Sequence, residues 1–326
     1  MTEIRDVRTV GGAPGAYDLR RATEAAARAA YDWIGRGDRA QGDHAAIAAM
    51  CDQLDGLGID GTILIGEGPR SETSMLYHGQ RFGDPGRLAQ WDIAVDPVEG
   101  TSFLAKGMTN AMAVIAMAPA GALFDPAPAF YMEKLAAPPA AKGRIDPAAP
   151  VETKLRQLAD ALNKSVEDLT VYVLEKPRHR DLVARIHSVG ARVALYPAGD
   201  VAGALMAAIP NSGIDALMGT GGTPEGMLSA CAIKVLGGEF IVRMDPQLAT
   251  ERRAVDEAGM DTTRWYGVDE LVRSDEVVFC ATGITTGLLF EGVERASGFE
   301  KTQTLMIGGA AGCRQLLTSW HKRGQG

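Results

Sequence analysis

Cysteine is scarce in this sequence. Four cysteines occur among 326 residues, and no two of them form a CxxC pair. Disulfide frameworks and structural zinc sites both depend on numerous or closely spaced cysteines. We therefore expect neither, and we predict reduced, mostly buried thiols in a cytoplasmic protein. The cysteines are Cys51, Cys231, Cys280 and Cys313.

Long apolar segments and an excess of positive charge are also absent. No stretch reaches the roughly 18 apolar residues of a membrane span, and the first residues lack a charged-then-apolar signal segment. Asp and Glu outnumber Lys and Arg by 41 to 33, which gives a net charge of -8. This balance predicts no general binding to nucleic acid or to a membrane surface. A phosphorylated ligand would then need metal ions or a local basic cluster.

The alternation of helix and strand patterns predicts an α/β protein, an α+β layered sandwich in two halves. We expect a flexible N-terminus over residues 1–17 and an N-terminal α+β domain over 18–165. A C-terminal α/β domain is expected over 166–326.

The N-terminal half is predicted to begin with two helices. The first is capped by Asp18 and buries a face from Leu19 to Trp33 at a spacing near 3.6. The second carries Asp43 near its start. Residues 118–150 are rich in Pro, Ala and Gly and are expected to form hairpins and connections. Strands are expected at 59–65, 75–77, 91–95 and 111–117, and a helix near 153–163.

The C-terminal half continues the α/β pattern. Strands are expected at 170–174, 191–196 and 215–218. Helices are expected at 179–189, from Asp200 to 208, and from Pro224 to 236.

Residues 96–101 (DPVEGT) follow a short apolar strand. We expect Asp96 at the strand end, Glu99 in a turn, a close backbone approach at Gly100 and the hydroxyl of Thr101 at a helix start. Two carboxylates and a hydroxyl in six residues suit a divalent cation and a phosphate. On local grounds a surface turn is the alternative.

Five acidic residues share this placement at strand ends or helix starts beside glycine. Burying them together would be strongly unfavourable, whereas two divalent cations would offset four of the five charges. Such a metal pair clamps the attacking and leaving oxygens of a phosphoryl displacement. Each residue could instead cap a helix or lie in a solvated turn. They are Asp43, Glu67, Asp96, Glu99 and Glu225.

Two further segments favour a phosphorylated ligand. The glycine-rich residues 219–226 fit neither a Walker loop nor GxGxxG, because no Lys-Ser or Lys-Thr follows and Pro224 takes the third glycine position. We expect this loop to turn backbone N–H groups towards a phosphate or sugar and to bring Glu225 to a metal. Residues 176–180 (KPRHR) follow a strand and supply groups that grip phosphate, with a solvated basic turn as the alternative. The sequence contains no GxSxG elbow, so it gives no support to nucleophilic serine catalysis.

With these motifs the chain resembles the class II fructose-1,6-bisphosphatase family, within the wider metal-dependent, lithium-sensitive sugar phosphatase group. Residues 96–101 match the D-P-x-[DE]-G-T motif of the wider group. Matches to the narrower family follow in family order: 33–38 (WIGRGD), 60–68 (DGTILIGEG), 75–77 (MLY), 131–135 (YMEKL), 176–179 (KPRH), 221–226 (GGTPEG) and 281–285 (ATGIT).

The resemblance implies stacked helix and sheet layers, a cofactor of two or more Mg²⁺ or Mn²⁺ ions, and hydrolysis of the 1-phosphate of fructose 1,6-bisphosphate. It implies that Asp43 and Glu67 hold one metal and that Asp96, Glu99 and Glu225 hold the other. A homo-oligomer, dimer or tetramer, is also expected. The residues expected to contact the sugar bisphosphate are Glu99, Gly100, Thr101, Tyr131, Lys176, Pro177, Arg178, Ala198, Gly199, Asp200 and Gly222.

The chain departs from the family pattern near the reacting water. Thr101 is expected to orient or polarise that water. Many members carry Asp where this chain has Ser71, so Glu72 or a metal-activated hydroxide would have to take over, and no general base is assigned. Ala198 also stands where many members carry Asp. A dual fructose-1,6-/sedoheptulose-1,7-bisphosphatase and a catalytically silent metal-binding homologue stay open as alternatives.

Overall fold

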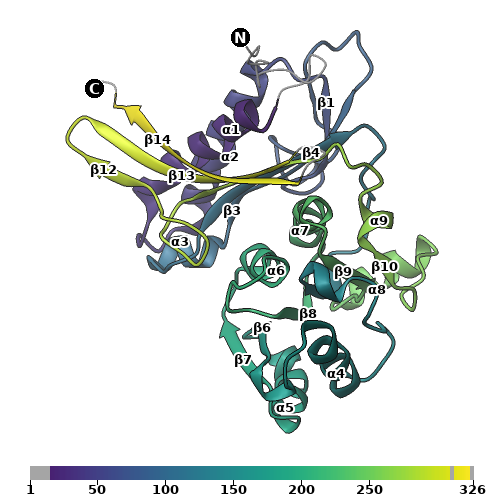
Figure 1. Cartoon of the computed structure of the whole chain (residues 1–326). Coiled ribbons are helices and arrows are strands. Elements are labelled where there is room, and N and C mark those ends of the chain that lie inside the picture. Colours follow the sequence, from purple (N-terminus) through teal and green to yellow (C-terminus); the bar gives the residue numbers. More distant parts are fainter. Residues whose placement is uncertain (1–14, 309–311, 324–326) are drawn as a thin grey trace, which may run out of the picture. The chain divides into compact units, whose positions relative to one another are not determined.

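A computed structural model describes residues 15–308 and 312–323 (Figure 1). The chain divides into two compact units: unit 1 comprises Met1–Gly121 and Glu276–Gly326, and unit 2 comprises Ala122–Asp275. Most of the flexible segment predicted over 1–17 lies outside the described residues. Its last two residues already belong to helix α1 (Ala16–Ala30).

Unit 1 is built on an eight-stranded sheet in the order β12-β13-β11-β4-β3-β1-β2, with β14 paired to β13. β1 and β3 are parallel, and the other neighbouring pairs are antiparallel. The strands are β1 (Gly61–Ile65), β2 (Arg81–Phe82), β3 (Trp91–Glu99), β4 (Met112–Pro119), β11 (Val278–Gly283), β12 (Glu294–Ala296), β13 (Phe299–Gly308) and β14 (Cys313–Lys322).

Two long helices pack together in unit 1, α1 and α2 (Arg39–Gly56), and α1 also packs on β4, β11 and β13. The cap predicted at Asp18 is wrong, because Gly15 precedes the helix and Asp18 lies in its first turn. Trp33 lies past the helix in a 3₁₀ turn, η1 (Tyr31–Trp33). The rest of the predicted inner face of α1 is buried: Leu19, Ala22, Ala26 and Ala30.

Unit 2 contains a six-stranded sheet in the order β10-β9-β5-β8-β6-β7. β6 is parallel to β7 and to β8, and the other pairs are antiparallel. The strands are β5 (Tyr131–Ala137), β6 (Thr170–Leu174), β7 (Arg192–Tyr196), β8 (Ala216–Gly222), β9 (Glu239–Met244) and β10 (Tyr266–Gly267).

Helices of unit 2 lie between or after these strands in the chain. They are α4 (Val151–Leu162), α5 (Arg180–Ser188), α6 (Asp200–Ala208), α7 (Thr223–Leu236), α8 (Ala249–Glu257) and α9 (Val268–Leu271), with 3₁₀ turns η2 (Pro139–Ala141), η3 (Val166–Asp168) and η4 (Pro177–His179).

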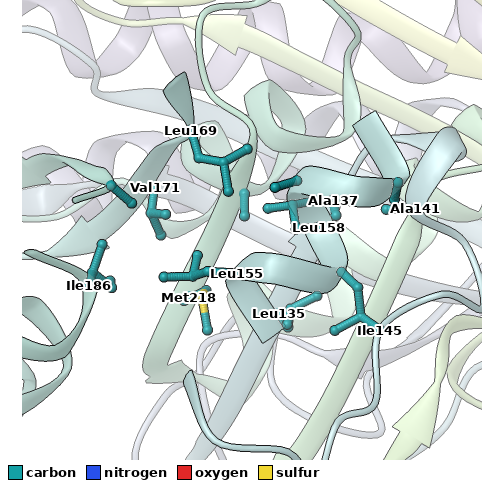
Figure 2. Packing of buried hydrophobic residues seen from close by; sticks show 14 of the residues in the cluster. Leu135, Ala137, Ala141, Ile145, Leu155, Leu158, Leu169, Val171, Ile186 and Met218 are labelled. Carbon is teal, nitrogen blue, oxygen red and sulfur yellow. The ribbon is translucent and has the colours of Figure 1, made fainter. Parts of the chain in front are cut away.

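A hydrophobic core joins strands and helices of unit 2 (Figure 2). Leu135 of β5, Val171 of β6 and Met218 of β8 pack there with Leu155 of α4 and Ile186 of α5. All five are buried, and burying a side chain of this size contributes about 1.5–3 kcal/mol relative to its exposure. This packing fixes the strand ends that carry the candidate site of unit 2.

The two compact units do not follow the halves expected from the sequence. Residues 122–165 lie in unit 2, because β5 pairs with β8 and β9. Residues 276–326 return to unit 1, because β11 pairs with β4 and β13 pairs with β11. The α+β layering itself is confirmed.

Two local predictions in residues 59–150 are wrong. The strand expected at 75–77 is a loop in which Leu76 has a φ of 53°. The segment 118–150 was expected to form hairpins and connections, yet it contains β5, an inner strand that pairs with the distant strands β8 and β9. In the described residues no helix combines the length and the apolar character that crossing a membrane requires.

Candidate active site

The end of β3 carries the first candidate cluster, in unit 1. β3 continues to Glu99 instead of ending at residue 95, but its register with β4 shifts between Asp96 and Glu99. A carboxylate oxygen of Asp96 accepts the backbone N–H of Val98 at 3.1 Å, which turns the chain locally. Gly100 then adopts a left-handed φ of 86°, and Thr101 begins helix α3 (Thr101–Lys106) as predicted.

The glycine at position 100 is required by this geometry. A side chain there would meet the ring of Phe103, whose Cδ2 lies 2.7 Å from an ideal Cβ position, and the positive φ disfavours other residues. The backbone therefore reverses between the Glu99 carboxylate and the Thr101 hydroxyl. Both groups are held within three residues of the strand end.

Glu67 lies two residues after the end of β1, beside the strand end as predicted. Its backbone N–H donates to the carbonyl of Leu76 at 2.9 Å. The same carbonyl oxygen lies 2.1 Å from where a Cβ at Gly66 would be. The loop that follows therefore folds back against the strand end only because residue 66 has no side chain.

Asp43 lies one turn inside α2. The helix is capped by Asp38, whose carboxylate accepts the N–H of Gln41 at 3.1 Å, so the capping role considered for Asp43 is excluded. Desolvation raises the pKa of Asp43, although the nearby His44 opposes the shift. A carboxylate in this position gains from a compensating cation.

Ser71 and Glu72 lie in the loop after Glu67, and both are exposed. The backbone N–H of Glu72 donates to the carbonyl of Pro69 at 2.9 Å. The structure thus places the carboxylate of Glu72 on a surface turn and leaves its predicted catalytic role untested.

The start of α7 holds the candidate cluster of unit 2. Gly222 precedes the helix, Pro224 lies in its first turn as predicted, and Glu225 follows. A Cβ at Gly222 would lie 2.0 Å from Oε2 of Glu225, so the carboxylate occupies space that only glycine leaves open. Desolvation raises the pKa of Glu225, an effect that the nearby Lys134 opposes.

Lys134 and Asp200 form a buried ion pair next to this helix start. Nζ of Lys134, on β5, donates to Oδ2 of Asp200 at 2.5 Å, and both residues are almost fully buried. Gly199 adopts a φ of 97° before α6, which begins with Asp200. An ideal Cβ at Gly221 would lie 1.8 Å from the same carboxylate oxygen. The glycine loop is therefore shaped around Asp200.

The predicted phosphate-binding segment lies between β6 and α5. The guanidinium of Arg178 donates to the carbonyl of Thr220 at 2.8 and 3.0 Å and lies 5.2 Å from the ring centroid of Tyr131. The structure thus brings these two predicted contacts together. Lys176 and Pro177 line a cavity of about 330 Å³ with Arg180 and its neighbours.

The ring of His179 holds this segment through two hydrogen bonds. Its Nε2 accepts the N–H of Thr220 at 2.8 Å, so its Nδ1 carries the proton that is donated to the carbonyl of Leu174 at 2.7 Å. Burial lowers the pKa of this imidazole, which keeps the ring neutral. Ala198 accepts a hydrogen bond from the hydroxyl of Tyr172 at 3.0 Å.

The predicted ligands are divided between the two units. Asp43, Glu67, Asp96 and Glu99 belong to unit 1, and Glu225 belongs to unit 2. Within the described residues, no three acidic, histidine or cysteine side chains already form a group able to hold a metal ion. The donors are nevertheless hard carboxylate oxygens, the ligand type that ions such as Mg²⁺ and Mn²⁺ take in proteins.

A sequence model of the family described as "Bacterial fructose-1,6-bisphosphatase, glpX-encoded" matches residues 14–321. The chain belongs to the class II fructose-1,6-bisphosphatase family. It is 42% identical over 319 residues to the Fructose-1,6-bisphosphatase 1 class 2 of Escherichia coli strain K12, with 94% of each chain covered. The Fructose-1,6-bisphosphatase class 2 proteins of Escherichia coli O6:H1 and of Shigella flexneri give the same values.

Glu251 is a further residue of this class II family member that the sequence did not single out. Its carboxylate accepts four backbone N–H groups, and the side chain is 1% exposed. Two of the donors are Tyr131, the first residue of β5, and Phe130 just before it, and the other two, Gln247 and Leu248, precede α8. Glu251 thus fastens the strand that carries Tyr131, a predicted substrate contact. Its sequence signal is its place as the third residue of α8, three residues after the N-cap Leu248.

Proposed function

We propose that this chain is a metal-dependent fructose-1,6-bisphosphatase that releases the 1-phosphate and leaves fructose 6-phosphate. The observation that carries the proposal is the 42% identity to a curated class 2 enzyme over 94% of the chain. The hydroxyl of Thr101 and the carboxylate of Glu99, fixed on either side of the reversal at Gly100, supply suitable chemistry. The proposal includes membership of the wider lithium-sensitive phosphatase group and a cytoplasmic location.

Five carboxylates would hold the metal ions. We assign Asp43 and Glu67 to one ion, and Asp96, Glu99 and Glu225 to the other. When bound, a pair of such ions neutralises developing charge and lowers the pKa of an attacking water. Phosphate-monoester hydrolysis needs accelerations of up to ~10²¹, more than positioning alone can supply.

The residues of unit 2 would bind the sugar bisphosphate. Arg178 and Lys176 carry the positive charge that an acidic protein needs for a phosphate. Tyr131 and the backbone at Gly222 contribute contacts beside them. Asp200, oriented by its ion pair with Lys134, would accept hydrogen bonds from sugar hydroxyls. Gly199 and Ala198, which precede Asp200, offer backbone groups to the same ligand.

Thr101 would position the attacking water, and Glu99 and Gly100 would lie against the transferring phosphate. Thr101 begins α3, so its hydroxyl is held by the helix start instead of by a mobile loop. Glu72 is the carboxylate available to take the proton of the water where relatives carry Asp at the position of Ser71.

Isosteric changes at two proposed ligands test the metal assignment. Asp96→Asn and Asp43→Asn should each lower metal-dependent phosphate release by at least about a hundredfold, because each removes a charged donor. Asp55→Asn, an exposed position on α2, is the matched control for Asp43 and should leave the rate unchanged. Mn²⁺ binding by calorimetry should weaken in parallel. Full turnover by Asp96→Asn would refute the assignment.

Sedoheptulose 1,7-bisphosphate is the second candidate substrate, because it shares the 1-phosphate end. Phosphate release from the two bisphosphates, measured side by side with the same enzyme and metal, separates a strict enzyme from a dual one. A metal-binding homologue without activity would release phosphate from neither, while still binding Mn²⁺.

A further inference from the structure

β14 is an unusual edge in the sheets of the described residues. The other outer strands are short: β2 and β10 have 2 residues each, β12 has 3 and β7 has 5. β14 has 10 residues and pairs with β13 from Cys313 to Lys322 without a bulge. In the described part of the chain, no strand pairs with its other edge. A long straight edge offers a row of backbone donors and acceptors to another strand.

The outward face of this hairpin carries three exposed apolar side chains. Leu316 and Trp320 are 54% and 65% exposed, and their even spacing puts them on one face of β14. Phe299 of β13 lies opposite Lys322 on that same face and is 46% exposed. β14 contains no proline and no bulge, and its two charged residues, Arg314 and Lys322, lie near its ends, so its centre lacks the features that prevent edge pairing in natural sheets.

The other face of β14 is fixed to its own unit. Ser319 donates to Oε1 of Glu24 in α1 at 2.6 Å, and Nε2 of His321 lies 2.8 Å from the hydroxyl of Thr302 in β13. Figure 1 shows β13 of this hairpin beside α1, on which it packs. The edge is therefore held in place before any partner binds, which lowers the entropic cost of pairing.

We propose that β14 is the pairing surface for a second copy of this chain, with the two β14 strands antiparallel about a two-fold axis perpendicular to the sheet. This symmetry gives an isologous contact, in which the same edge is used twice. The axis also keeps the outward faces of the two sheets on the same side. Each outward-facing residue of one β14 strand therefore lies opposite an outward-facing residue of the other. Edge pairing of this kind joins the two sheets into one.

Charge selects the register of the pair. With Leu317 on the axis, residues 313–321 of both copies pair, and Arg314 lies opposite Trp320 of the second copy at two equivalent places. With Thr318 on the axis, Arg314 would oppose Lys322, and like charges directly opposite are unfavourable. With Leu316 on the axis, only residues 313–319 would pair. The first register is favoured.

The favoured register explains why a second copy is the occupant. Trp320 already has the ammonium of Lys301 6.0 Å from its ring centroid, and it stays largely exposed. Arg314 of the second copy would cover it with a guanidinium, which aromatic rings attract. Each β14 strand therefore supplies one ring, Trp320, and one cation, Arg314. The pair of strands contains two equivalent contacts between Arg314 of one copy and Trp320 of the other.

The association can be measured on the full chain by sedimentation velocity over micromolar concentrations. Trp320→Lys places a lysine opposite Arg314 twice and should raise the dissociation constant at least about tenfold. Adding Arg314→Glu to this variant restores opposite charges and should recover most of the affinity. Leu88→Lys, which changes an 88% exposed leucine outside β14, is the matched control and should have no effect.

Cysteine pairs test the register itself. In a Cys313→Ser background, Leu316→Cys combined with Thr318→Cys should form an intermolecular disulfide, because these exposed residues oppose each other in the favoured register. Either cysteine alone should not. A monomeric wild-type chain, an oligomer that Trp320→Lys leaves unchanged, or equal cross-linking by the single cysteines would overturn the proposal.

Discussion

The four hydrogen bonds accepted by Glu251 give a sharp test of how the candidate site of unit 2 is held. One carboxylate oxygen accepts the N–H groups of Phe130 and Tyr131 at 2.6 and 2.8 Å, and the other accepts those of Gln247 and Leu248 at 2.8 and 3.3 Å. The Glu251→Gln change has the same shape but only one acceptor oxygen. Its amide nitrogen must therefore face two backbone donors.

The expected loss follows from these two orphaned donors. Leaving a buried donor without an acceptor costs about 1–3 kcal/mol. The two orphaned donors face the same amide group, so their costs are not independent. We expect Glu251→Gln to lower the free energy of unfolding by about 2–4 kcal/mol. Because Tyr131 begins β5 at this contact, KM for the sugar bisphosphate should rise as well.

Urea unfolding, with the slope fitted as well as the midpoint, measures this loss. Glu257→Gln is the matched control, since Glu257 lies exposed on the same helix, α8, and its change should stay within about 0.5 kcal/mol. Equal stability of the two variants would refute the claim that Glu251 fastens β5 to α8.

Two further predictions concern buried charges of unit 2. Lys134→Met leaves the carboxylate of Asp200 buried without its cation and should cost about 3–5 kcal/mol in urea unfolding, whereas adding Asp200→Asn should recover most of the loss; no recovery would show that the pair is not coupled. His179 takes up a proton in the unfolded chain near pH 6.5 but only at a lower pH when folded, so its contribution to stability is present above about pH 6.5 and is lost as the pH falls below that value. His179→Asn should flatten this part of the pH dependence of unfolding, and the exposed control His187→Asn should not.

The sequence predicted several element starts and ends better than the partners of the strands, although β3 and β8 both extend four residues beyond their predicted ends. The strand at 59–65 and the helix start at Thr101 were found because apolar runs, glycine and a helix-start hydroxyl are local signals. The same holds for the Gly222–Glu225 helix start. Glu67, Glu99 and Glu225 lie next to these positions, so the local signals predicted where these three carboxylates are placed, and their roles stay predictions.

Long-range pairing carried no such signal. β5 was missed because Pro, Ala and Gly surround it, although β8 and β9 flank it in the sheet. The boundary of the two units could not be read locally, because residues 276–326 return to pair with β4 through β11. Asp43 resembled a helix cap, and only the structure showed that Asp38 has that role. Lys134 lay within a family motif, but its ion pair with Asp200 depends on the fold.

The central claim is the metal-dependent removal of the 1-phosphate of fructose 1,6-bisphosphate. Phosphorus NMR of the full reaction, with Mg²⁺ or Mn²⁺ and again after chelation, observes both products at once. The account predicts inorganic phosphate and fructose 6-phosphate in equal amounts with metal, and no reaction after chelation. Fructose 1-phosphate as the product, or undiminished release in the chelated sample, would contradict it.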